Sequence, residues 1–554
     1  MIRPAARRAS GIPDTPPQDS AGANDSSRDD APRCSARESI DNQTPGRSDI
    51  RRMSSPCRLL IAACAAAALT LPACTKYDPL YCDANTRCTD PDRPFCDLAG
   101  DYPASDGVAR TCIPDPNPHS DADAGSGGPG DSGNADGGAP SEDAATERHI
   151  IQISTGRQHT CVVLNDGGLR CWGEGIALGY PDAENIGDDE HPYQAGDVPT
   201  GGRIKQVAAG ASFTCALYEA GNIRCWGFNH GLLGYGHEDD LFGPGNTPDL
   251  LPDVDVGGPA AQIVTGGSHT CALLESGDVR CWGLNTLYEL GTGDQASIGD
   301  NEVPGSRSPV LLGGKATRIS TSDHHTCALV AGGFVRCWGT MLAFSRTGPM
   351  GYGGAEIVGD DEALPDLGNI NVGGSALAVA AGQAHTCVLL SEGRVRCWGV
   401  GHLPKDASYT LGYQENEDIG DDETPASAGN VDVGGQVVEL AAAGSARCAR
   451  LSAGSVRCWG TEPPGVPTSG VLGHGSRDPI GDDEAPAGAG NVQIGGAAVM
   501  LSSGGPTVHM CALLDDDSLR CWGSNTGGEL GLGFTDDVGD DETPADVDPV
   551  RVFE

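Results

Sequence analysis

HTCALLESGDVRCWG, residues 269–283, recurs in near-copies six more times along this chain of 554 residues. Each copy keeps two cysteines ten positions apart, with an arginine before the second cysteine and Trp-Gly after it. The copies contain every tryptophan of the chain: Trp172, Trp226, Trp282, Trp338, Trp398, Trp459 and Trp522. Self-similarity at a spacing of 54 to 63 residues indicates repeated units rather than several unrelated domains.

The residues between the two cysteines predict a β-hairpin. In the third copy a three-residue loop, Glu275-Ser276-Gly277, places Gly277 where the backbone must be left-handed. Cys271 and Cys281 then face each other across two antiparallel strands, close enough for a disulfide. The alternative is a pair of buried free thiols. The same reasoning predicts seven bridges: Cys161–Cys171, Cys215–Cys225, Cys271–Cys281, Cys327–Cys337, Cys387–Cys397, Cys448–Cys458 and Cys511–Cys521.

Each unit reads as about four short strands joined by turns. In the third unit these are residues 261–267, 269–276, 278–285 and 309–312, with a Leu-Gly turn and an acidic loop before the last strand. Abundant glycine (82) and proline (38) favour short strands and turns over long helices. Four strands are the content of one propeller blade, so we predict an all-β, seven-bladed propeller of four-stranded blades over residues 148–554.

The repeated pattern G-x-x-H-T-x-A-L…G-x-V-x-x-W-G-x-N…G-x-L-G resembles the regulator of chromosome condensation repeat, also called the alpha-tubulin suppressor repeat. The resemblance covers roughly residues 149–554 and implies a seven-bladed propeller. Proteins of this fold include nuclear exchange factors, plant photoreceptors and secreted bacterial inhibitors, so the fold alone does not select a function. The typical intracellular member lacks the cysteine pair. The pair therefore favours an exported variant and argues against guanine-nucleotide exchange.

The two ends of the repeat region predict how the ring closes. Residues 150–156 (IIQISTG) match the small-residue first strand of other units, and residues 549–554 (PVRVFE) match the Val-rich last strand. We expect the last strand to pair in one blade with the first, which would leave no free edge there.

An export signal precedes the repeats. Residues 1–52 are polar and read as disordered, or as an artefact of the start site if translation begins at Met53. Residues 59–71 form a short apolar run that fits the core of a signal peptide over residues 53–73. The run ends in Leu-Pro-Ala-Cys74, which resembles the lipobox of bacterial lipoproteins and implies acylation of Cys74. The alternative is an ordinary signal peptide. Thr75 after the cysteine resembles outer-membrane sorting, so we expect an outer-membrane lipoprotein.

Two further segments separate this signal from the repeats. Residues 74–112 hold Cys82, Cys88, Cys96 and Cys112 with too few apolar residues for a core, which predicts two disulfides of open connectivity or, less favoured, a zinc site. Residues 113–147 read as a flexible acidic linker.

Charge and cysteine usage restrict the partners. A formal charge of −42 repels phosphate backbones, so we expect no nucleic-acid partner, and the self-repelling surface favours a monomer. Eighteen of the 22 cysteines follow Cys74, an even number that suits disulfides in an oxidising compartment. We therefore expect contact with the membrane only through the lipid anchor.

Two repeated side chains within the motif read as structural. An arginine precedes each second cysteine and shares a strand face with the tryptophan, so it is expected to be partly buried and paired between blades rather than to bind a ligand. These arginines are Arg170, Arg224, Arg280, Arg336, Arg396, Arg457 and Arg520. A histidine occupies one position in five units, but Phe213 and Ala446 replace it elsewhere. That tolerance favours hydrogen bonding over metal or acid–base work.

The acidic loop is the main candidate site. It reads Gly-Asp-Asp-Glu in most units, and equivalent loops of a propeller share one rim. The candidate residues are Asp188, Asp189, Glu190, Asp300, Glu302, Asp360, Asp361, Glu362, Asp421, Asp422, Glu423, Asp482, Asp483, Glu484, Asp540, Asp541 and Glu542. We expect these acids to cap turns and pair with the repeated arginines. The alternatives are Ca²⁺ binding, since hard oxygen ligands suit that ion, and a docking face for a basic partner.

No catalytic motif stands out, and we expect no cofactor and no catalytic residue. The favoured function is a non-enzymatic cell-envelope lipoprotein that binds an extracellular or envelope protein, or a glycan, through unit-specific insertions. These insertions are residues 226–248, 341–354 and 400–413. The alternative is a polysaccharide hydrolase or lyase that uses paired carboxylates of the acidic rim.

Overall fold

The computed structural model describes residues 95–96, 112–113 and 147–554, with gaps at 183, 344–345, 355–356, 361–362, 402–410, 415–416, 462–468, 503 and 506. The chain divides into two compact units, residues 1–124 and 125–554. In the first unit β1 (Phe95–Cys96) pairs antiparallel with β2 (Cys112–Ile113), which sets Cys96 opposite Cys112. The predicted signal peptide, Cys74, Cys82, Cys88 and nearly all of the linker lie outside the described residues.

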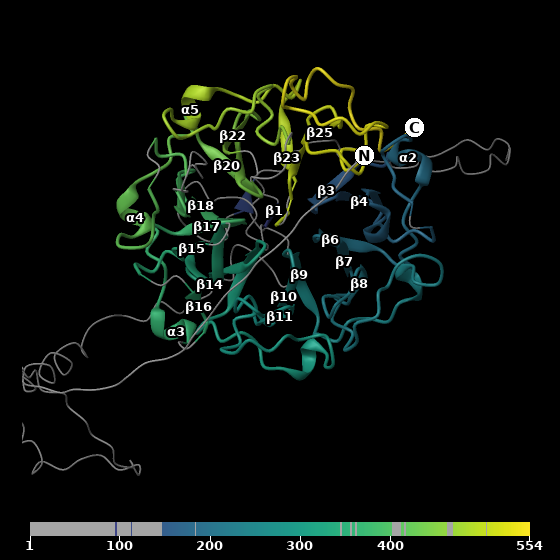
Figure 1. Ribbon diagram of the computed structural model, residues 1–554, viewed down its shortest axis with the longest axis horizontal. Helices are drawn as coiled ribbons and strands as arrows, with labels where there is room; N and C mark the ends of the chain where they lie inside the picture. The colour runs from purple at the N-terminus through teal and green to yellow at the C-terminus, as the bar shows by residue number, and fades with distance from the viewer. Residues whose placement is uncertain are drawn as a thin grey trace, which may run out of the picture. The chain divides into compact units, whose positions relative to one another are not determined.

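The second unit is a ring of seven antiparallel sheets, one for each copy of the motif; each has three core strands, and the sheet of blade 4 has two more (Figure 1). Blades 1 to 3 are β3 (Ile150–Thr155), β4 (His159–Leu164), β5 (Leu169–Gly173); β6 (Ile204–Ala209), β7 (Phe213–Tyr218), β8 (Ile223–Gly227); and β9 (Ala260–Thr265), β10 (His269–Leu274), β11 (Val279–Gly283). Blades 4 and 5 are β12 (Ala316–Thr321), β13 (His325–Val330), β14 (Phe334–Ala343); and β17 (Ala376–Gly382), β18 (His385–Leu390), β19 (Val395–Gly399). Blades 6 and 7 are β20 (Val437–Ala443), β21 (Ala446–Leu451), β22 (Val456–Gly460); and β23 (Ala498–Leu501), β24 (His509–Leu514), β25 (Leu519–Gly523).

Short elements occupy the connections between blades. Blade 4 adds β15 (Arg346–Gly348) and β16 (Ile357–Val358), and the helical turns are η2 (Gly175–Ala177), α2 (Pro192–Ala195), η3 (Pro248–Leu250), η4 (Pro304–Ser306), α3 (Leu364–Leu367), α4 (Pro425–Ala428) and α5 (Pro486–Ala489). Most of these turns carry proline at their first or second position, where its missing N–H has no helical partner to lose. None of the helices in the described ranges has the length and apolar composition needed to cross a membrane.

The prediction of four-stranded blades is wrong for every blade but blade 4. The Val-rich segment makes one backbone hydrogen bond to the start of the third strand, as from Val198 N–H to Leu169 C=O. The acidic loop adds contact at the far end of that strand, as between Gly173 and Ile186; only in blade 4 does this become a two-residue strand, β16. Both segments are too short and too rich in glycine and proline to form a ladder.

A tyrosine hydroxyl covers the outer edge between these contacts in blades 2, 4 and 5. Tyr235 Oη accepts a hydrogen bond from Cys225 N–H (3.1 Å) and donates to Cys225 C=O (3.0 Å). Tyr352 and Tyr413 do the same for Cys337 and Cys397. The hydroxyl thus satisfies the edge groups that a fourth strand would have bound.

The predicted exchange of strands between the chain ends is also wrong. Val550 donates its N–H to Leu519 in the last blade itself (2.9 Å), and β3 pairs with β4 of the first blade. The carboxyl-terminal segment instead contacts blade 1 through single bonds. Tyr193 N–H donates to Arg551 C=O, and the Arg170 guanidinium donates to Val552 C=O. Each blade is therefore built from consecutive residues.

The tryptophans explain why the blades hold together. All seven are fully buried, and six donate the indole N–H to a carbonyl in the connection that follows the preceding blade. Trp226, for example, donates to Ala177 C=O (3.0 Å). The glycine of the Leu-Gly turn lies against the same indole, and a Cβ on Gly179 would sit 2.7 Å from Trp226 Nε1. The Trp-Gly and Leu-Gly signatures of the repeat are thus two halves of one contact between blades.

Candidate functional site

The hairpins have the expected register and pairing. Cys271 lies opposite Cys281 in the β10–β11 ladder, with Cα atoms 4.1 Å apart, and the pair is disulfide-bonded. The other six pairs have the same arrangement. The cysteines are nearly or fully buried, which shields each bridge from solvent.

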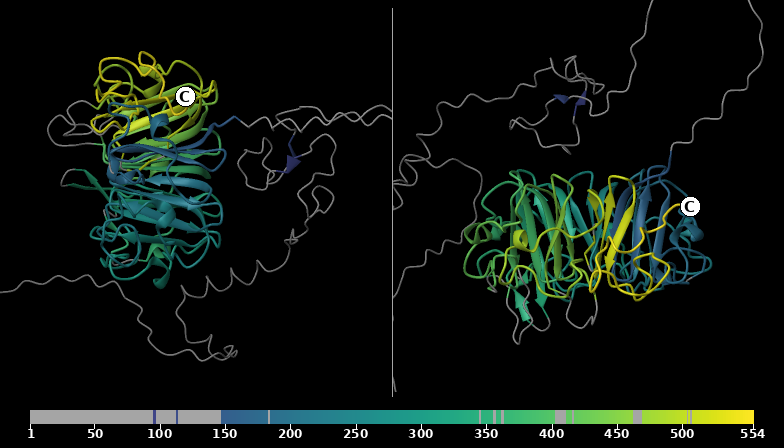
Figure 2. Two further views of the ribbon diagram at one scale, coloured as in Figure 1. Left: turned by 90° about the vertical axis from the view of Figure 1, so that its right-hand side faces the viewer. Right: turned by 90° about the horizontal axis from the view of Figure 1, so that it is seen from above.

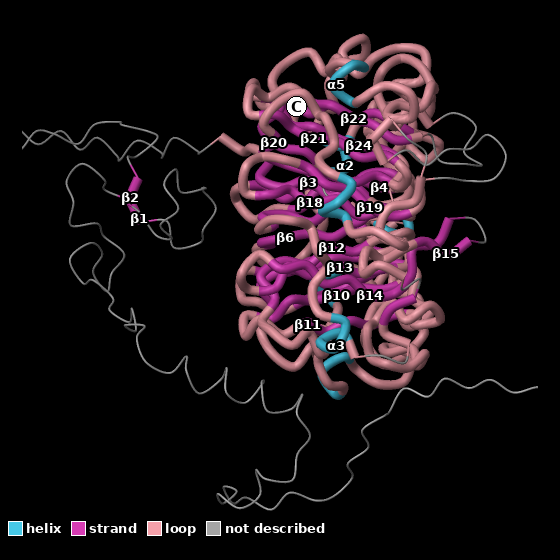
Figure 3. The backbone as a smooth tube through the Cα atoms, turned by 90° about the vertical axis from the view of Figure 1, so that its left-hand side faces the viewer, coloured by secondary structure: helices cyan, strands magenta, loops and turns pink. Residues whose placement is uncertain are grey.

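The ring has two unlike faces. One, the hairpin face, carries the tips between second and third strands, such as residues 165–168. The chain enters the ring there, since Arg148 pairs with Asp166 at 2.7 Å. The other, the loop face, carries the connections that begin where the third strands end. Figure 2 shows the chain entering at one face and the β14–β15 hairpin projecting from the opposite one. Figure 3 shows β15 extending beyond all the other strands.

The acidic loops lie at equivalent places around the loop face. Their leading glycines have a positive φ and pack against the Leu-Gly turn of the preceding blade. A Cβ on Gly187 (φ 100°) would lie 2.5 Å from Gly528 C=O, and one on Gly539 (φ 104°) would lie 2.3 Å from Gly470 C=O. The Gly of Gly-Asp-Asp-Glu is therefore required by packing between blades.

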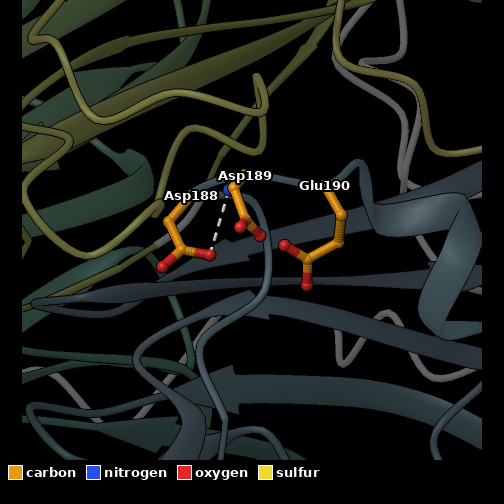
Figure 4. Close-up of side chains that lie close together, drawn as sticks. All are labelled: Asp188, Asp189 and Glu190. Atoms are coloured by element: carbon orange, nitrogen blue, oxygen red, sulfur yellow. Dashed lines mark hydrogen bonds between the residues drawn. The ribbon is translucent and has the colours of Figure 1, made fainter.

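Four of these loops bring three carboxylates together. In each, one oxygen from every acid lies within 4.8 Å of the others; the loops are residues 188–190, 421–423, 482–484 and 540–542. Figure 4 shows the first of them, where the Asp189 N–H donates to Asp188 Oδ1 at 3.1 Å. In blade 3, Glu302 pairs instead with Arg307 at 3.3 Å, and Asp300 accepts from Asn301 N–H. Asp360 is half-buried, and Asp361 and Glu362 lie outside the described residues.

Crowding of these acids changes their titration. Burial and the neighbouring Asp541 and Asp540 raise the pKa of Glu542 to about 7. Burial and adjacent aspartates also raise the pKa of Glu190, Glu423 and Glu484. The loop of Glu542 can therefore take up a proton near neutral pH. As a calcium site they are incomplete, because Ca²⁺ takes six to eight oxygen ligands and none of the four clusters groups more than three acids.

The expected pairing of rim acids with the repeated arginines is wrong. Arg170 and Arg224 pair at 2.8 Å with Asp197 and Asp253, which lie near the hairpin face. Arg336, Arg396 and Arg457 bind an asparagine amide oxygen at the same position: Asn369, Asn430 and Asn491. All seven also donate to backbone carbonyls. The strand places each guanidinium at the start of the third strand, whereas the acidic loop contacts its end.

Four of those arginines bridge blades, as predicted. Arg336, Arg396 and Arg457 donate to Leu312, Val372 and Val433, which lie in the segment that leads out of the preceding blade. Arg170 binds the carboxyl-terminal segment in the same way. The other three donate to the connection that follows their own blade.

The repeated histidines make structural hydrogen bonds between blades. In four seams Nε2 meets the threonine hydroxyl of the next blade at 2.7–2.8 Å; the pairs are His159–Thr214, His269–Thr326, His325–Thr386 and His509–Thr160. All five histidines are fully buried, and desolvation lowers their pKa values, to about 3 for His159. In the seam that follows His385, Arg447 occupies the position of the threonine. The charge of this arginine lowers the pKa of His385 further.

Sequence reasoning missed an asparagine that separates two kinds of loop. Asn229, Asn285 and Asn525 follow Trp-Gly by two positions, are fully buried, and donate their amides to carbonyls within their own loops. The other four blades, 1, 4, 5 and 6, have Gly175, Met341, Gly401 and Glu462 there instead. Blades 4, 5 and 6 are consecutive and carry two of the three predicted insertions, together with residues 461–470, which the sequence interpretation overlooked. The third predicted insertion, residues 226–248, lies in blade 2 and contains Asn229. The presence or absence of the asparagine in the W-G-x-N part of the motif could have predicted which loops differ.

The comparisons with known proteins agree with this architecture. The model of the regulator of chromosome condensation (RCC1) repeat matches residues 150–175, 204–231, 260–288 and 377–402. The chain is 30% identical to the ultraviolet-B receptor UVR8 of Arabidopsis thaliana over 47% of this chain and 56% of that protein. It is 27% identical to the mitochondrial RCC1 domain-containing protein RUG3 of the same plant, over 46% and 54%. It thus spans about half the length of these curated relatives.

A solved structure has the same fold. A crystal structure of yeast RCC1 (Prp20) bound to Kap60 aligns with a TM-score of 0.51 at 18% identity, over 71% of this chain and 84% of that one. Fold and repeated residues together define an all-β protein of RCC1-type repeats arranged as a seven-bladed propeller. Its repeats match the model of the regulator of chromosome condensation repeat, and the chain is similar to proteins that carry this repeat.

Proposed function

We propose that this protein is a non-enzymatic binding scaffold that works outside the cytoplasm and recognises a protein, or a glycan, through blades 4 to 6 of its loop face. The carrying observation is the break in sevenfold symmetry. Blades 2, 3 and 7 hold their loops with a buried asparagine; blades 1, 4, 5 and 6 lack it, and of these only the consecutive blades 4, 5 and 6 also carry insertions. Unlike loops on a rigid ring suit recognition of one distinct partner.

The β14–β15 hairpin is the best described part of this region. β14 has ten residues against five in β11, and Met341 pairs with Gly348 to lead into the hairpin. Met341 is fully buried, and a Cβ on Gly348 would lie 2.2 Å from Val400 Cγ2 of blade 5. The projecting hairpin is thus anchored at its base on two blades, which limits the entropy lost on binding.

Similar proteins support a protein partner. Yeast RCC1 is bound to Kap60 in the crystal structure described above, so a propeller of this fold binds a protein. The cysteine pairs support an oxidising compartment, because seven disulfides would not persist in a reducing cytosol.

The binding proposal is tested with the full chain, a cross-linker and mass spectrometry of envelope partners. A variant with residues 342–347 replaced by Gly-Gly should lose at least tenfold of the captured partner. The matched control carries Asp188→Asn, Asp189→Asn and Glu190→Gln in blade 1 and should keep it. Loss in the control with retention in the hairpin variant would move the site to the acidic rim and contradict the proposal.

One observation favours a second candidate function, the hydrolysis of a polysaccharide. The pKa of Glu542 is raised to about 7 beside Asp540 and Asp541, and an acid that keeps its proton near neutral pH next to other carboxyl groups is part of the machinery of glycoside hydrolysis. The same arrangement in four loops argues for a shared structural role. Turnover of a polysaccharide that disappears in Asp188→Asn or Asp360→Asn would establish the enzyme instead.

We also propose that Cys74 carries the lipid anchor of an outer-membrane lipoprotein. The support is the Leu-Pro-Ala-Cys74 sequence after an apolar run of signal-peptide length. Cells expressing the full chain and fed labelled palmitate should yield labelled protein, and Cys74→Ser should yield none. Equal labelling of the two chains would refute the anchor.

A further inference from the structure

Two glutamates occupy equivalent buried positions in the ring but have different surroundings. Glu289 follows blade 3 and Glu529 follows blade 7; their exposed fractions are 1% and 0%. Each carbonyl accepts the indole N–H and the threonine hydroxyl of the next blade: Trp338 and Thr326 bind Glu289, and Trp172 and Thr160 bind Glu529. Both residues therefore lie inside a seam between blades, and Glu529 lies in the seam that joins the last blade to the first.

The two carboxyl groups differ in their counter-charges. Glu289 Oε1 is 3.8 Å from His324 Nδ1, and Leu287 N–H donates to its other oxygen at 2.8 Å. Glu529 receives the Gly527 N–H at 2.6 Å and a long bond from the Thr526 hydroxyl at 3.5 Å. Blade 1 has Gln158 where blade 4 has His324. Among the described residues, no lysine or arginine pairs with the Glu529 carboxyl group.

The charged groups near Glu529 do not favour its ionised form. Asp537 of the same loop repels it, whereas Glu174 and Asp188 of blade 1 approach the turn at Gly527 and Gly528 with their backbone nitrogens and supply no positive charge there. The nearby imidazoles are His509 of β24 and His159 of β4, and desolvation keeps both neutral by lowering their pKa values to about 3. A buried carboxylate without a cation is costly, so the neutral acid is favoured in the closed seam.

We propose that the contact between the last and first blades is a pH-sensitive closure, in which protonated Glu529 holds the seam shut and its ionisation loosens it. Desolvation raises the pKa of Glu529 to about 7, above its ordinary value, whereas for Glu289 the histidines outweigh the desolvation and the pKa is lowered. The closed seam therefore holds a proton that an opened seam releases. Closure weakens as pH rises from about 4.5 towards 7 and then levels off.

The test is amide hydrogen exchange of the full chain at pH 6 and pH 8, corrected for intrinsic rates. Protection of β3–β5 and β24–β25 should fall by about tenfold more than that of β10–β11 and β13–β14, which form the seam of Glu289. Each seam contains two fully buried histidines, so the titration of these four cancels in the comparison; the additional His324 beside Glu289 is controlled by the Glu289→Gln variant. Equal pH responses of the two seams would overturn the proposal.

Two variants separate the carboxyl group from its surroundings. Glu529→Gln keeps the shape and the hydrogen bonds, and should remove the extra loss of protection between pH 6 and pH 8. Glu289→Gln is the matched control and should leave the response of the closing seam unchanged. A response that persists in Glu529→Gln would contradict the assignment to this residue.

Discussion

At the scale of single residues, the blades are joined by side chains that fit only one neighbour. The glycine of the Leu-Gly turn is the clearest case, because its missing Cβ makes room for the next indole. We predict that Gly179→Ala lowers the free energy of unfolding by more than about 2 kcal/mol, since it adds a clash to the strain of a positive φ.

The control for that substitution is Gly196→Ala. Gly196 also has a positive φ (74°), but nothing lies within 4 Å of its added Cβ. It should lose less stability than Gly179→Ala, because only backbone strain is added; φ 74° with ψ −157° is a region that glycine alone adopts readily, at a cost of about 1–3 kcal/mol. Urea unfolding measures both variants, and equal losses would show that the contact with Trp226 contributes little.

The buried histidines predict acid sensitivity. Desolvation lowers the pKa of His159, His325 and His509 to about 3 and that of His269 to about 4, well below the unfolded value. The unfolded chain therefore binds more protons than the folded one, and stability falls as pH drops from about 6.5 towards 3. Each histidine contributes up to about 1.4 kcal/mol per pH unit. In urea unfolding at pH 7, 6 and 5, the midpoint concentration of urea should fall with each step to lower pH. A midpoint that does not change with pH would mean that the histidines are already charged in the ring.

At the scale of elements, local chemistry decided what the sequence could predict. The hairpin followed from the ten-residue cysteine spacing and the turn at Ser276, because register and side-chain face are set within fifteen residues. The outer edge was mispredicted because Val-rich segments look like strands in isolation. Whether they form a ladder depends on competition from Tyr235 and its equivalents, which arrive from a turn elsewhere in the unit.

That competition gives a test at the outer edge. Tyr235→Phe removes the one hydroxyl that serves both backbone groups of Cys225, leaving an N–H and a C=O without it. We expect a loss of about 1–3 kcal/mol in the free energy of unfolding. The control is Tyr193→Phe, because the hydrogen bond of Tyr193 to Arg551 C=O comes from its backbone N–H and survives the substitution. Similar stability of Tyr235→Phe and the wild type would indicate that water replaces the hydroxyl.

At the scale of the whole molecule, repetition made the ring predictable and its closure unpredictable. Seven motif copies imply seven blades, but which segments pair at the junction depends on contacts between Arg170, Tyr193 and the chain end. The candidate site was only partly predictable for the same reason. The acidic rim was visible in the sequence as a repeated pattern. Which side chains pair with the rim acids and with the arginines could be seen only in the folded structure.

Asymmetry was the feature that repetition concealed. A consensus emphasises what units share, and the asparagines of blades 2, 3 and 7 matter because other blades lack them. Blades 4 to 6, which lack the asparagine and carry the insertions, are consecutive, and a ring turns them into one region of the loop face. We therefore propose that the binding region lies where the units differ from one another, while the shared motif builds the scaffold.

The central claim is a propeller locked by hairpin disulfides for work outside the cytoplasm, and non-reducing peptide mapping of protein from the native envelope tests it most directly. An arginine precedes every second cysteine, so tryptic cleavage after Arg280 separates Cys271 from Cys281 unless a disulfide joins them. We predict seven bridges: five as joined peptide pairs, and two, Cys215–Cys225 and Cys271–Cys281, in one set of three peptides, because residues 225–280 form a single tryptic peptide. Recovery of these cysteines as separate alkylated thiols would contradict the account.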